Sequence, residues 1–182
     1  TTVDRQCGSA QQAVHFAAQG VMAGAYDVVI AAGVESMSRV PIFSNVNCGP
    51  GRTYGEYFRK RYGVQDDVIN QGVSADVIAR KWGFDRTHLD KIAVESHARA
   101  NRAQQEGRFE GEIVPITIDD DSGERTVRID EGIRPTTTLE TLANLKPSFG
   151  ADGLHTAGSS SQISDGAAAL LIMSREKAEA LG

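Results

Sequence analysis

The feature that most constrains the fold is a cysteine that directly precedes a run of small residues and then an apolar strand. Cys7 is followed by Gly8 and Ser9, and residues 8–24 place alanines and valines at spacings of three and four. This periodicity predicts a helix whose inner face is almost entirely small, so that it can pack closely against other backbone. Residues 27–33 are a continuous apolar run bounded by turn residues, which predicts a buried parallel strand. Cysteine, helix and strand together indicate a layered α/β domain.

A cysteine at the start of a helix is well placed for thiolate chemistry, because the helix dipole and the free backbone N–H groups favour the anion. A free cysteine is more often a small buried hydrophobe, so it is the position of Cys7 that makes it a candidate nucleophile. His15 is in the same predicted helix, more than about 10 Å away at roughly 1.5 Å per residue, and cannot be its base. We interpret Cys48, in a loop rich in glycine and proline, as structural or incidental.

Composition argues against several classes of function. The 182 residues include 19 basic and 24 acidic side chains, and the net charge of −5 argues against nucleic-acid binding. No apolar run approaches the roughly 20 residues that cross a bilayer, so we predict no membrane partner. Two cysteines make no disulfide framework, which favours a cytoplasmic location. The cysteines and the four histidines lack metal-ligand spacing, and we predict neither a metal nor a resident cofactor.

The pattern changes between residues 39 and 155 to loops, short helices and a hairpin. The periodicity there predicts four helices and two strands that flank an acidic turn, with the helices at 57–62, 74–82, 86–106 and 139–145 and the strands at 112–118 and 125–129. Residues 167–173 then form another apolar run, which predicts a second buried strand, and Ser174 caps a last helix. We expect the strands at 28–33 and 167–173 to share one sheet, with a covering domain inserted between them.

Five short motifs follow one another along the chain and together span nearly all of it. They are Cys-Gly-Ser at 7–9, Gly-Val-Glu-Ser-Met-Ser at 33–38, Glu-Gly-Arg-Phe at 106–109 with Glu-Ile-Val-Pro at 112–115, Asp-Glu-Gly-Ile-Arg-Pro at 130–135, and the stretch 156–168. In this order and spacing they resemble the thiolase family, which includes acetyl-CoA acetyltransferases and 3-ketoacyl-CoA thiolases.

The resemblance implies a layered αβαβα core made of two similar halves, with an α+β loop domain inserted in the first half. We therefore assign residues 1–38 to the second half of the N-terminal core domain and 39–155 to the inserted domain that covers coenzyme A. Residues 156–182 would be the returning strand and helix of the core. The chain begins without a methionine and ends with a helical pattern. We expect an internal piece of a longer polypeptide, without the C-terminal core domain.

The resemblance also implies an acyltransferase whose partners are acyl-CoA and coenzyme A, the latter as co-substrate. Cys7 would be acylated and would later pass its acyl group to coenzyme A or to a second acyl-CoA. Arg134 matches the arginine that contacts the phosphates of coenzyme A, Ser161 matches the serine that contacts pantetheine, and Phe149 and Ala157 line the same tunnel. The family's catalytic histidine and second cysteine belong to the other half, so we expect this chain alone to be inactive. A homodimer or homotetramer is implied as well.

Two departures keep other functions open. Residues 70–72 are Asn-Gln-Gly where many thiolases carry His-Met-Gly, and Ser159 stands where an asparagine usually follows Thr-Ala-Gly. The first changes the expected lining of the acyl and pantetheine pocket. Because of the two departures, a thiolase-like protein that binds acyl-CoA or lipid without turnover is the alternative. A condensing enzyme of the ketoacyl-synthase type shares the core, but an insertion as long as 39–155 argues against it. His155 matches no family position, and we interpret it as a surface or packing residue.

Overall fold

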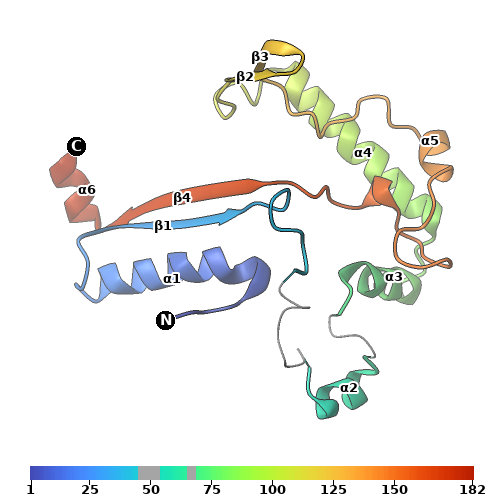
Figure 1. Cartoon of the computed structure of the whole chain (residues 1–182), viewed down its shortest axis with the longest axis horizontal. Coiled ribbons are helices and arrows are strands. Elements are labelled where there is room, and N and C mark those ends of the chain that lie inside the picture. Colours follow the sequence, from blue (N-terminus) through green and yellow to red (C-terminus); the bar gives the residue numbers. More distant parts are fainter. Residues whose placement is uncertain (45–53, 65–68) are drawn as a thin grey trace. The chain divides into compact units, whose positions relative to one another are not determined.

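The computed structural model describes most of the chain, namely residues 1–44, 54–64 and 69–182 (Figure 1). The chain forms two compact units. Unit 1 comprises Thr1–Pro50 and Ile163–Gly182, and unit 2 comprises Gly51–Gln162. The domain boundaries that the sequence predicts, after residue 38 and before residue 156, remain predictions.

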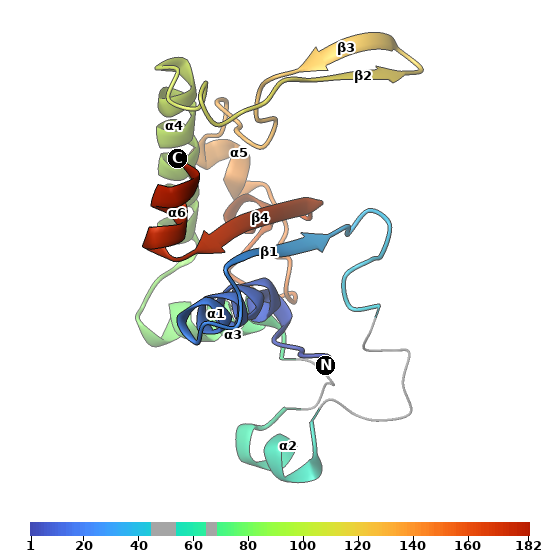
Figure 2. The same cartoon turned by 90° about the vertical axis from the view of Figure 1, so that its left-hand side faces the viewer.

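Unit 1 is a pair of strands with a helix along one face. The turn η1 (Gln6–Gly8) leads into α1 (Ser9–Met22), and the other elements are β1 (Val28–Glu35), β4 (Gly166–Met173) and α6 (Arg175–Leu181). The two strands pair with each other, as the sequence predicts, and α1 packs on them (Figure 2). Ala17 of α1 and Ala31 of β1 are both buried, which agrees with a helix whose inner face is small.

The direction of the strand predicted at 27–33 was wrong. The sequence predicts a parallel strand there, but β4, the strand that pairs with β1 in the described residues, runs antiparallel to it, with Val28 opposite Met173 and Glu35 opposite Gly166. The chain leaves β1 at the same end of the pair at which it later enters β4. A connection that departs from and returns to one end of a sheet requires antiparallel strands, however long the inserted segment is.

The predicted burial of these two strands was also wrong. Ile30 of β1 is 67% exposed, and Leu170 and Leu171 of β4 are 54% and 61% exposed. Apolar residues on both faces of a strand are typical of sheets covered on both sides. Within the described residues, α1 packs on one face of the strand pair. The apolar composition of both strands is therefore typical of a sheet that is more fully covered than this pair is in unit 1.

Unit 2 is mainly helical and carries one hairpin. Its elements are α2 (Glu56–Tyr62), α3 (Gln71–Lys81), α4 (Arg86–Gln105), β2 (Ile116–Asp120), β3 (Gly123–Val127), α5 (Leu139–Ala143) and the short turn η2 (Ala157–Ser159). α4 packs against α5 and η2, and its buried residues Leu89 and Ala93 share the small core with Leu142 of α5. The long helix α4 is therefore the scaffold on which the later loops of this unit rest.

Capping side chains explain where the helices begin. Asp85 accepts the amide of His88 at 2.9 Å at the start of α4, and Ser174 caps α6 in the same way, as predicted. α3 begins earlier than the predicted residue 74, because the Asn70 side chain accepts the amides of the first helical turn. Gly83 follows α3 in the left-handed conformation, which only glycine adopts freely.

The hairpin is shorter than the sequence predicts. β2 starts at Ile116 rather than at residue 112, because the amides of Glu112 and Ile113 turn back onto the carbonyl of Phe109. Its acidic turn is tight, since Asp120 pairs directly with Gly123. Across the three described stretches of chain, no helix combines the length and apolarity that a membrane span needs.

Candidate active site

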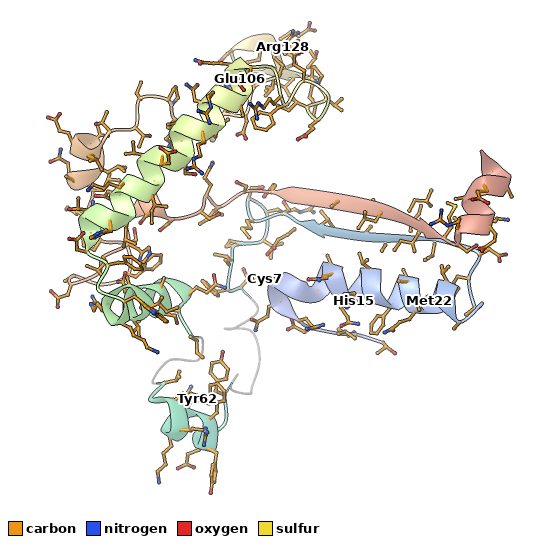
Figure 3. All side chains as sticks on the ribbon, turned by 180° about the vertical axis from the view of Figure 1, so that it is seen from behind. Cys7, His15, Met22, Tyr62, Glu106 and Arg128 are labelled. Carbon is orange, nitrogen blue, oxygen red and sulfur yellow. The ribbon has the colours of Figure 1, made fainter. Side chains whose placement is uncertain are left out.

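Cys7 lies in η1, immediately before α1, and its thiol is exposed (Figure 3). The preceding residue, Gln6, has φ of 50°, a left-handed conformation that costs free energy for any residue other than glycine. Two hydrogen bonds hold it: the Gln6 amide donates to Asp4 Oδ1 at 2.8 Å, and the Gly8 amide donates to the Arg5 carbonyl at 2.9 Å. A strained but well-bonded turn thus presents the thiol at the start of the helix.

The turn is also fastened to the helix and, through it, to the strand. The Arg5 amide donates to Ser9 Oγ at 3.0 Å, and its guanidinium donates to Gln12 Oε1 at 2.7 Å. The first turn of α1 touches β1, because a Cβ built on Gly33 would lie only 2.7 Å from the Cβ of Ala10. A side chain at position 33 would push away the helical turn that follows Cys7.

Nothing near the thiol in the described part of unit 1 serves as its base. His15 lies further along α1 and away from Cys7, as expected (Figure 3). No hydrogen bond joins the Cys7 thiol to a histidine or a carboxylate anywhere in residues 1–44, 54–64 and 69–182. Cys48 falls outside these stretches. In its described residues, unit 1 therefore offers an exposed thiol without a hydrogen-bonded proton acceptor.

The end of β1 is tied to the start of β4 by Asp165. Its carboxylate accepts the amide of Ser38 at 2.8 Å and the hydroxyl of Ser36 at 3.0 Å, and it also accepts the Ser38 hydroxyl. The Ser38 hydroxyl and then the Ser38 amide hold the pKa of Asp165 below its ordinary value. The motif 33–38 therefore supports the strand end.

The other predicted site residues all belong to unit 2. Arg134 is exposed, but its backbone is fixed, since its amide donates to His97 Nδ1 of α4 at 3.2 Å and its carbonyl accepts the Thr137 hydroxyl at 2.8 Å. The turn before it touches the end of the loop that carries the predicted pantetheine contact, because a Cβ on Gly132 would lie 2.3 Å from Gln162 Nε2. The backbone of the turn that precedes Arg134 thus lies beside Gln162.

Ser161 and Ala157 are exposed and lie on one loop. Ala157 starts the η2 turn, while Ser161 follows it, and its hydroxyl lies 3.2 Å from the Gln162 carbonyl. The loop is rooted by Thr156, which is fully buried and whose hydroxyl accepts the Gly158 amide at 3.2 Å. Because Thr156 is buried and the residues Ala157 and Ser161 that follow it are exposed, the loop can present these two residues to a ligand.

Phe149 is half-buried against α3. Its ring lies over Gly72 so closely that a Cβ there would come within 2.2 to 2.4 Å of three ring carbons. The next contact joins this segment to the loop of Ala157, since the Ser148 amide donates to the His155 carbonyl at 2.9 Å. Phe149, Ala157, Ser161 and Arg134 therefore come from three loops of unit 2, of which the loop of Ala157 and Ser161 contacts each of the other two.

Sequence reasoning missed a buried contact between two ionisable side chains of unit 2. Asp76 of α3 accepts the His155 ring Nδ1 at 2.6 Å and the His155 amide at 3.0 Å. Burial raises the pKa of Asp76, but hydrogen bonds from the His155 side chain and from the backbone of His155 and Leu154 outweigh it, and the pKa lies below its ordinary value. His155 is thus a packing residue, one of the two roles predicted for it. The two partners are far apart in the chain, and no local pattern signals such a pair.

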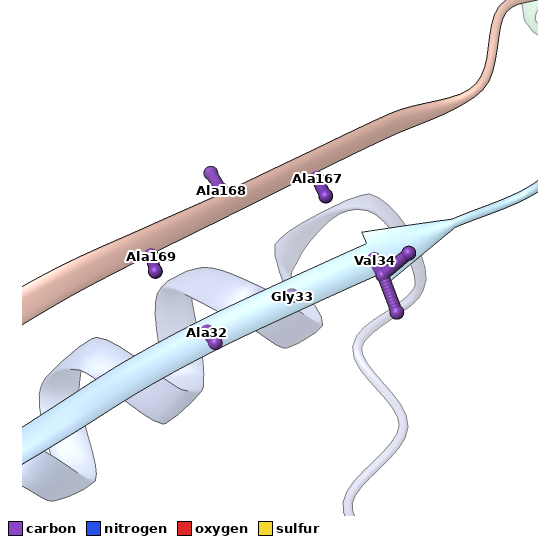
Figure 4. Close-up of a pocket in the computed structure, with 6 residues that line it drawn as sticks. All are labelled: Ala32, Gly33, Val34, Ala167, Ala168 and Ala169. Carbon is purple, nitrogen blue, oxygen red and sulfur yellow. The ribbon is translucent and has the colours of Figure 1, made fainter.

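An open depression lies over the strand pair in the described part of unit 1. It is lined by small residues, namely Ala32, Gly33, Val34 and residues 167–169 (Figure 4). None of the predicted site residues lines it. Within the described residues no group of histidine, cysteine and carboxylate side chains is arranged to hold a metal ion.

Unit 1 places an exposed cysteine at the start of a helix that packs on a strand pair, and a long insertion separates the two strands in the chain. This arrangement is that of an α/β protein of the thiolase class. The chain belongs to the thiolase family: the pattern of the family described as "Thiolase, N-terminal domain" matches residues 1–176. The fold predicted from the sequence, a part of the thiolase core with an inserted domain, is confirmed.

Curated relatives and solved structures that resemble the chain belong to the same family. The chain is 46% identical over 187 residues to the human protein named 3-ketoacyl-CoA thiolase, peroxisomal, and 43% identical over 190 residues to the 3-ketoacyl-CoA thiolase of Bacillus subtilis; each match covers 100% of this chain, but 43% and 47% of the relative. Human mitochondrial 3-ketoacyl-CoA thiolase superposes with a TM-score of 0.77 at 32% identity, over 99% of this chain and 47% of that one. The acetyl-CoA acetyltransferase of Syntrophomonas wolfei gives 0.75 at 32% identity, over 100% and 47%. The chain thus spans under half the length of these proteins.

Proposed function

We propose that the chain is the nucleophile-bearing part of a thiolase, an acyltransferase that cleaves 3-ketoacyl-CoA with coenzyme A. The observation that carries the proposal is the exposed Cys7 at the start of α1, in a chain whose match to the family extends over residues 1–176. The names of the relatives, 3-ketoacyl-CoA thiolase and acetyl-CoA acetyltransferase, support the same reaction class.

In this reaction the Cys7 thiolate attacks the 3-keto carbon of the substrate. The bond between C2 and C3 breaks, its electron pair stays on C2, and C2 takes up a proton to give acetyl-CoA. The shortened acyl group remains on Sγ until the thiol of a second coenzyme A attacks it, which releases acyl-CoA and restores the thiol. The same steps in reverse give a Claisen condensation.

The chain supplies some of the groups that these steps need. The backbone N–H of Cys7 is a candidate donor to the oxyanion that forms when the thiolate attacks. Deprotonation of the thiol and protonation of C2 require a base and an acid, and unit 1 pairs neither with Cys7 in its described residues. We therefore propose that these groups come from the part of the fold that the relatives have in addition.

Coenzyme A is proposed to bind on unit 2. The exposed guanidinium of Arg134 suits the phosphates, since its fork of N–H groups matches their oxygens. Ser161 would contact pantetheine, and Phe149 and Ala157 would line the same tunnel. The contacts between the three loops that carry these residues support one continuous surface for the ligand.

Selective alkylation tests the assignment of the nucleophile. In the complete enzyme that carries this chain, iodoacetamide should modify Cys7 first, and 3-ketoacyl-CoA should protect it. Peptide mapping by mass spectrometry locates the label, and Cys7→Ser is the control that should abolish both labelling at this position and turnover. Preferential modification of Cys48, with Cys7 left unmodified, would refute the proposal.

A binding protein without turnover is the second candidate, and two contacts favour it. Asn70, at the start of the stretch where many thiolases carry His-Met-Gly, uses its carboxamide to cap α3. Ser159, in place of the usual asparagine, turns its hydroxyl back onto Thr156, at 3.1 Å from its amide. Neither side chain is directed to a ligand in this way. Turnover that depends on Cys7 would retire this candidate.

We further propose a homodimer or homotetramer that acts in the cytoplasm. The exposed apolar strands of unit 1 support association with other protein surface, because such strands are costly to leave in water. The scarcity of cysteine supports a reducing compartment. Light scattering and localisation of the tagged protein would test the two statements separately.

A further inference from the structure

Two segments of the proposed coenzyme A surface are attached to one face of α3. The ring of Phe149 lies on Gly72, and one helical turn later the carboxylate of Asp76 binds His155. Residues four apart lie on the same face of a helix, so a single face of α3 holds the chain on both sides of residues 150–154.

The Asp76–His155 contact is suited to fixing a loop in one position. The two side chains are 3% and 15% exposed, so solvent screens their interaction little. An ionised carboxylate only accepts hydrogen bonds, which means that Nδ1 of His155 carries a proton and donates it. The other carboxylate oxygen lies 3.0 Å from where a Cβ on Gly153 would be, so the loop backbone passes close beside it. Asp76 therefore holds His155 by both its side chain and its backbone.

The contact is continuous with the buried turn that follows it. The His155 carbonyl accepts the Ser148 amide at 2.9 Å, so both backbone groups of this residue are used. Thr156 is fully buried, its hydroxyl accepts the Gly158 amide at 3.2 Å, and its carbonyl accepts the Ser160 hydroxyl at 2.7 Å. Hydrogen bonds therefore hold the segment up to residue 160, and two charged groups of α3 bind the loop: the buried Asp76 carboxylate and the Arg80 guanidinium, which donates to the Asp152 carbonyl at 2.6 Å.

We propose that Asp76 and His155 are positioning residues for the pantetheine arm of coenzyme A. They set where the turn at 157–161 lies, and they act through that turn rather than by touching the ligand. The inference rests on the proposed function, because it assumes that this surface binds coenzyme A. The Arg134 backbone is fixed separately by α4, so the phosphate contact does not depend on the pair.

The test compares two ligands, coenzyme A and adenosine 3′,5′-bisphosphate, which lacks pantetheine, by titration calorimetry on the 182-residue chain. His155→Ala removes the ring but keeps the hydrogen bond from the backbone amide of residue 155 to Asp76, so we expect the fold to be preserved. We expect it to weaken coenzyme A binding roughly tenfold, as loss of a charge-assisted hydrogen bond does, and to leave the bisphosphate unchanged. His155→Asn places an amide N–H near the position of Nδ1 and should recover most of the loss.

A matched control exists in the same unit. His88 pairs with Asp85 at 2.8 Å through the same atoms, but this pair is exposed and lies at the start of α4. His88→Ala should change neither affinity. Amide hydrogen exchange in the free chain gives an independent readout, since exchange at His155 and Gly158 should accelerate in His155→Ala and not in His88→Ala.

The outcomes separate the two proposals. Unchanged coenzyme A binding in His155→Ala, with the wild type binding normally, overturns the positioning role and leaves the proposed function standing. An equal loss for both ligands also overturns it, because a general structural effect would explain such a loss. A wild-type chain that binds neither ligand refutes the proposed surface on unit 2, and the positioning role is refuted with it.

Discussion

Gln6 carries backbone strain directly beside the candidate nucleophile. Its φ of 50° costs about 1 to 3 kcal/mol for a residue with a side chain, and a β-branched residue tolerates this conformation worst. We expect Gln6→Val to lower the free energy of unfolding by about 1 to 2 kcal/mol and to slow the alkylation of Cys7, because the turn relaxes away from its position. Urea denaturation and the rate of iodoacetamide labelling measure the two effects.

Glycine at the same position is the informative control. Gln6→Gly adopts the left-handed conformation without strain, so it should label at close to the wild-type rate and lose little stability. If Gln6→Val and Gln6→Gly alkylate equally fast, the conformation of Gln6 has no role in presenting the thiol.

The sequence predicts a residue's position well when a local pattern determines it, and poorly when a contact with a distant part of the chain determines it. The sequence placed Cys7 at a helix start, which the structure confirms, and its chemical role remains a prediction. The pairing of Asp76 with His155 could not be predicted, because it depends on how α3 packs against a loop 79 positions away. The roles of Arg134 and Ser161 came from family resemblance and not from periodicity.

At the scale of elements, Arg86 clamps α4 to α5. Its Nε lies 2.8 and 2.9 Å from the two carboxylate oxygens of Asp90, and its terminal nitrogens donate to the carbonyls of Leu142 and Leu145 at the end of α5. Lysine cannot make this planar set of bonds. We expect Arg86→Lys to lower the free energy of unfolding by about 1 to 3 kcal/mol, measured by urea denaturation.

Arg99 provides the comparison, because its pair with Glu95 has the same spacing on the same helix but is 70% and 60% exposed. Exposed pairs of this kind contribute about 0.5 kcal/mol or less, so Arg99→Lys should be nearly neutral. Equal losses in the two variants would contradict the clamp.

Asp165 links the loops at the end of the strand pair, and its pKa gives unit 1 a pH dependence. The pKa is lowered in the folded state, mainly by the Ser38 hydroxyl, so folding favours the ionised form. The resulting stability is present above the ordinary pKa of aspartate and is lost as the pH falls through the folded value. We expect denaturant midpoints to fall less steeply between about pH 5 and pH 3 in Asp165→Asn than in the wild type. A wild-type slope in Asp165→Asn would contradict the link.

How well an element could be predicted depended on whether its determinants are local. The capping residues Asp85 and Ser174 set the starts of α4 and α6, and both starts were predicted correctly. The predicted direction of β1 was wrong, because the direction depends on where the chain re-enters the sheet after a long insertion. The start of α3 was missed since the cap at Asn70 precedes the apolar periodicity by several residues.

At the scale of the whole molecule, the two units hold different parts of one proposed reaction. Unit 1 carries the thiol and unit 2 carries the proposed coenzyme A surface, while the relatives are more than twice as long as this chain. A thioester exchange needs the thiolate, a base and an acid together, and removal of one member of such a set usually abolishes most of the rate. Neither unit pairs a base with Cys7 in its described residues.

We therefore expect the 182-residue chain by itself to catalyse no thiolysis while still binding coenzyme A. The measurement is the release of acetyl-CoA from a 3-ketoacyl-CoA in the presence of coenzyme A, followed by mass spectrometry, with the full-length Bacillus subtilis relative as the positive control. Ligand binding, measured on the same sample, shows that the chain is folded, so inactivity cannot be ascribed to misfolding. Turnover by the chain alone that disappears in Cys7→Ser would contradict the expectation, because it would mean that these residues contain their own base.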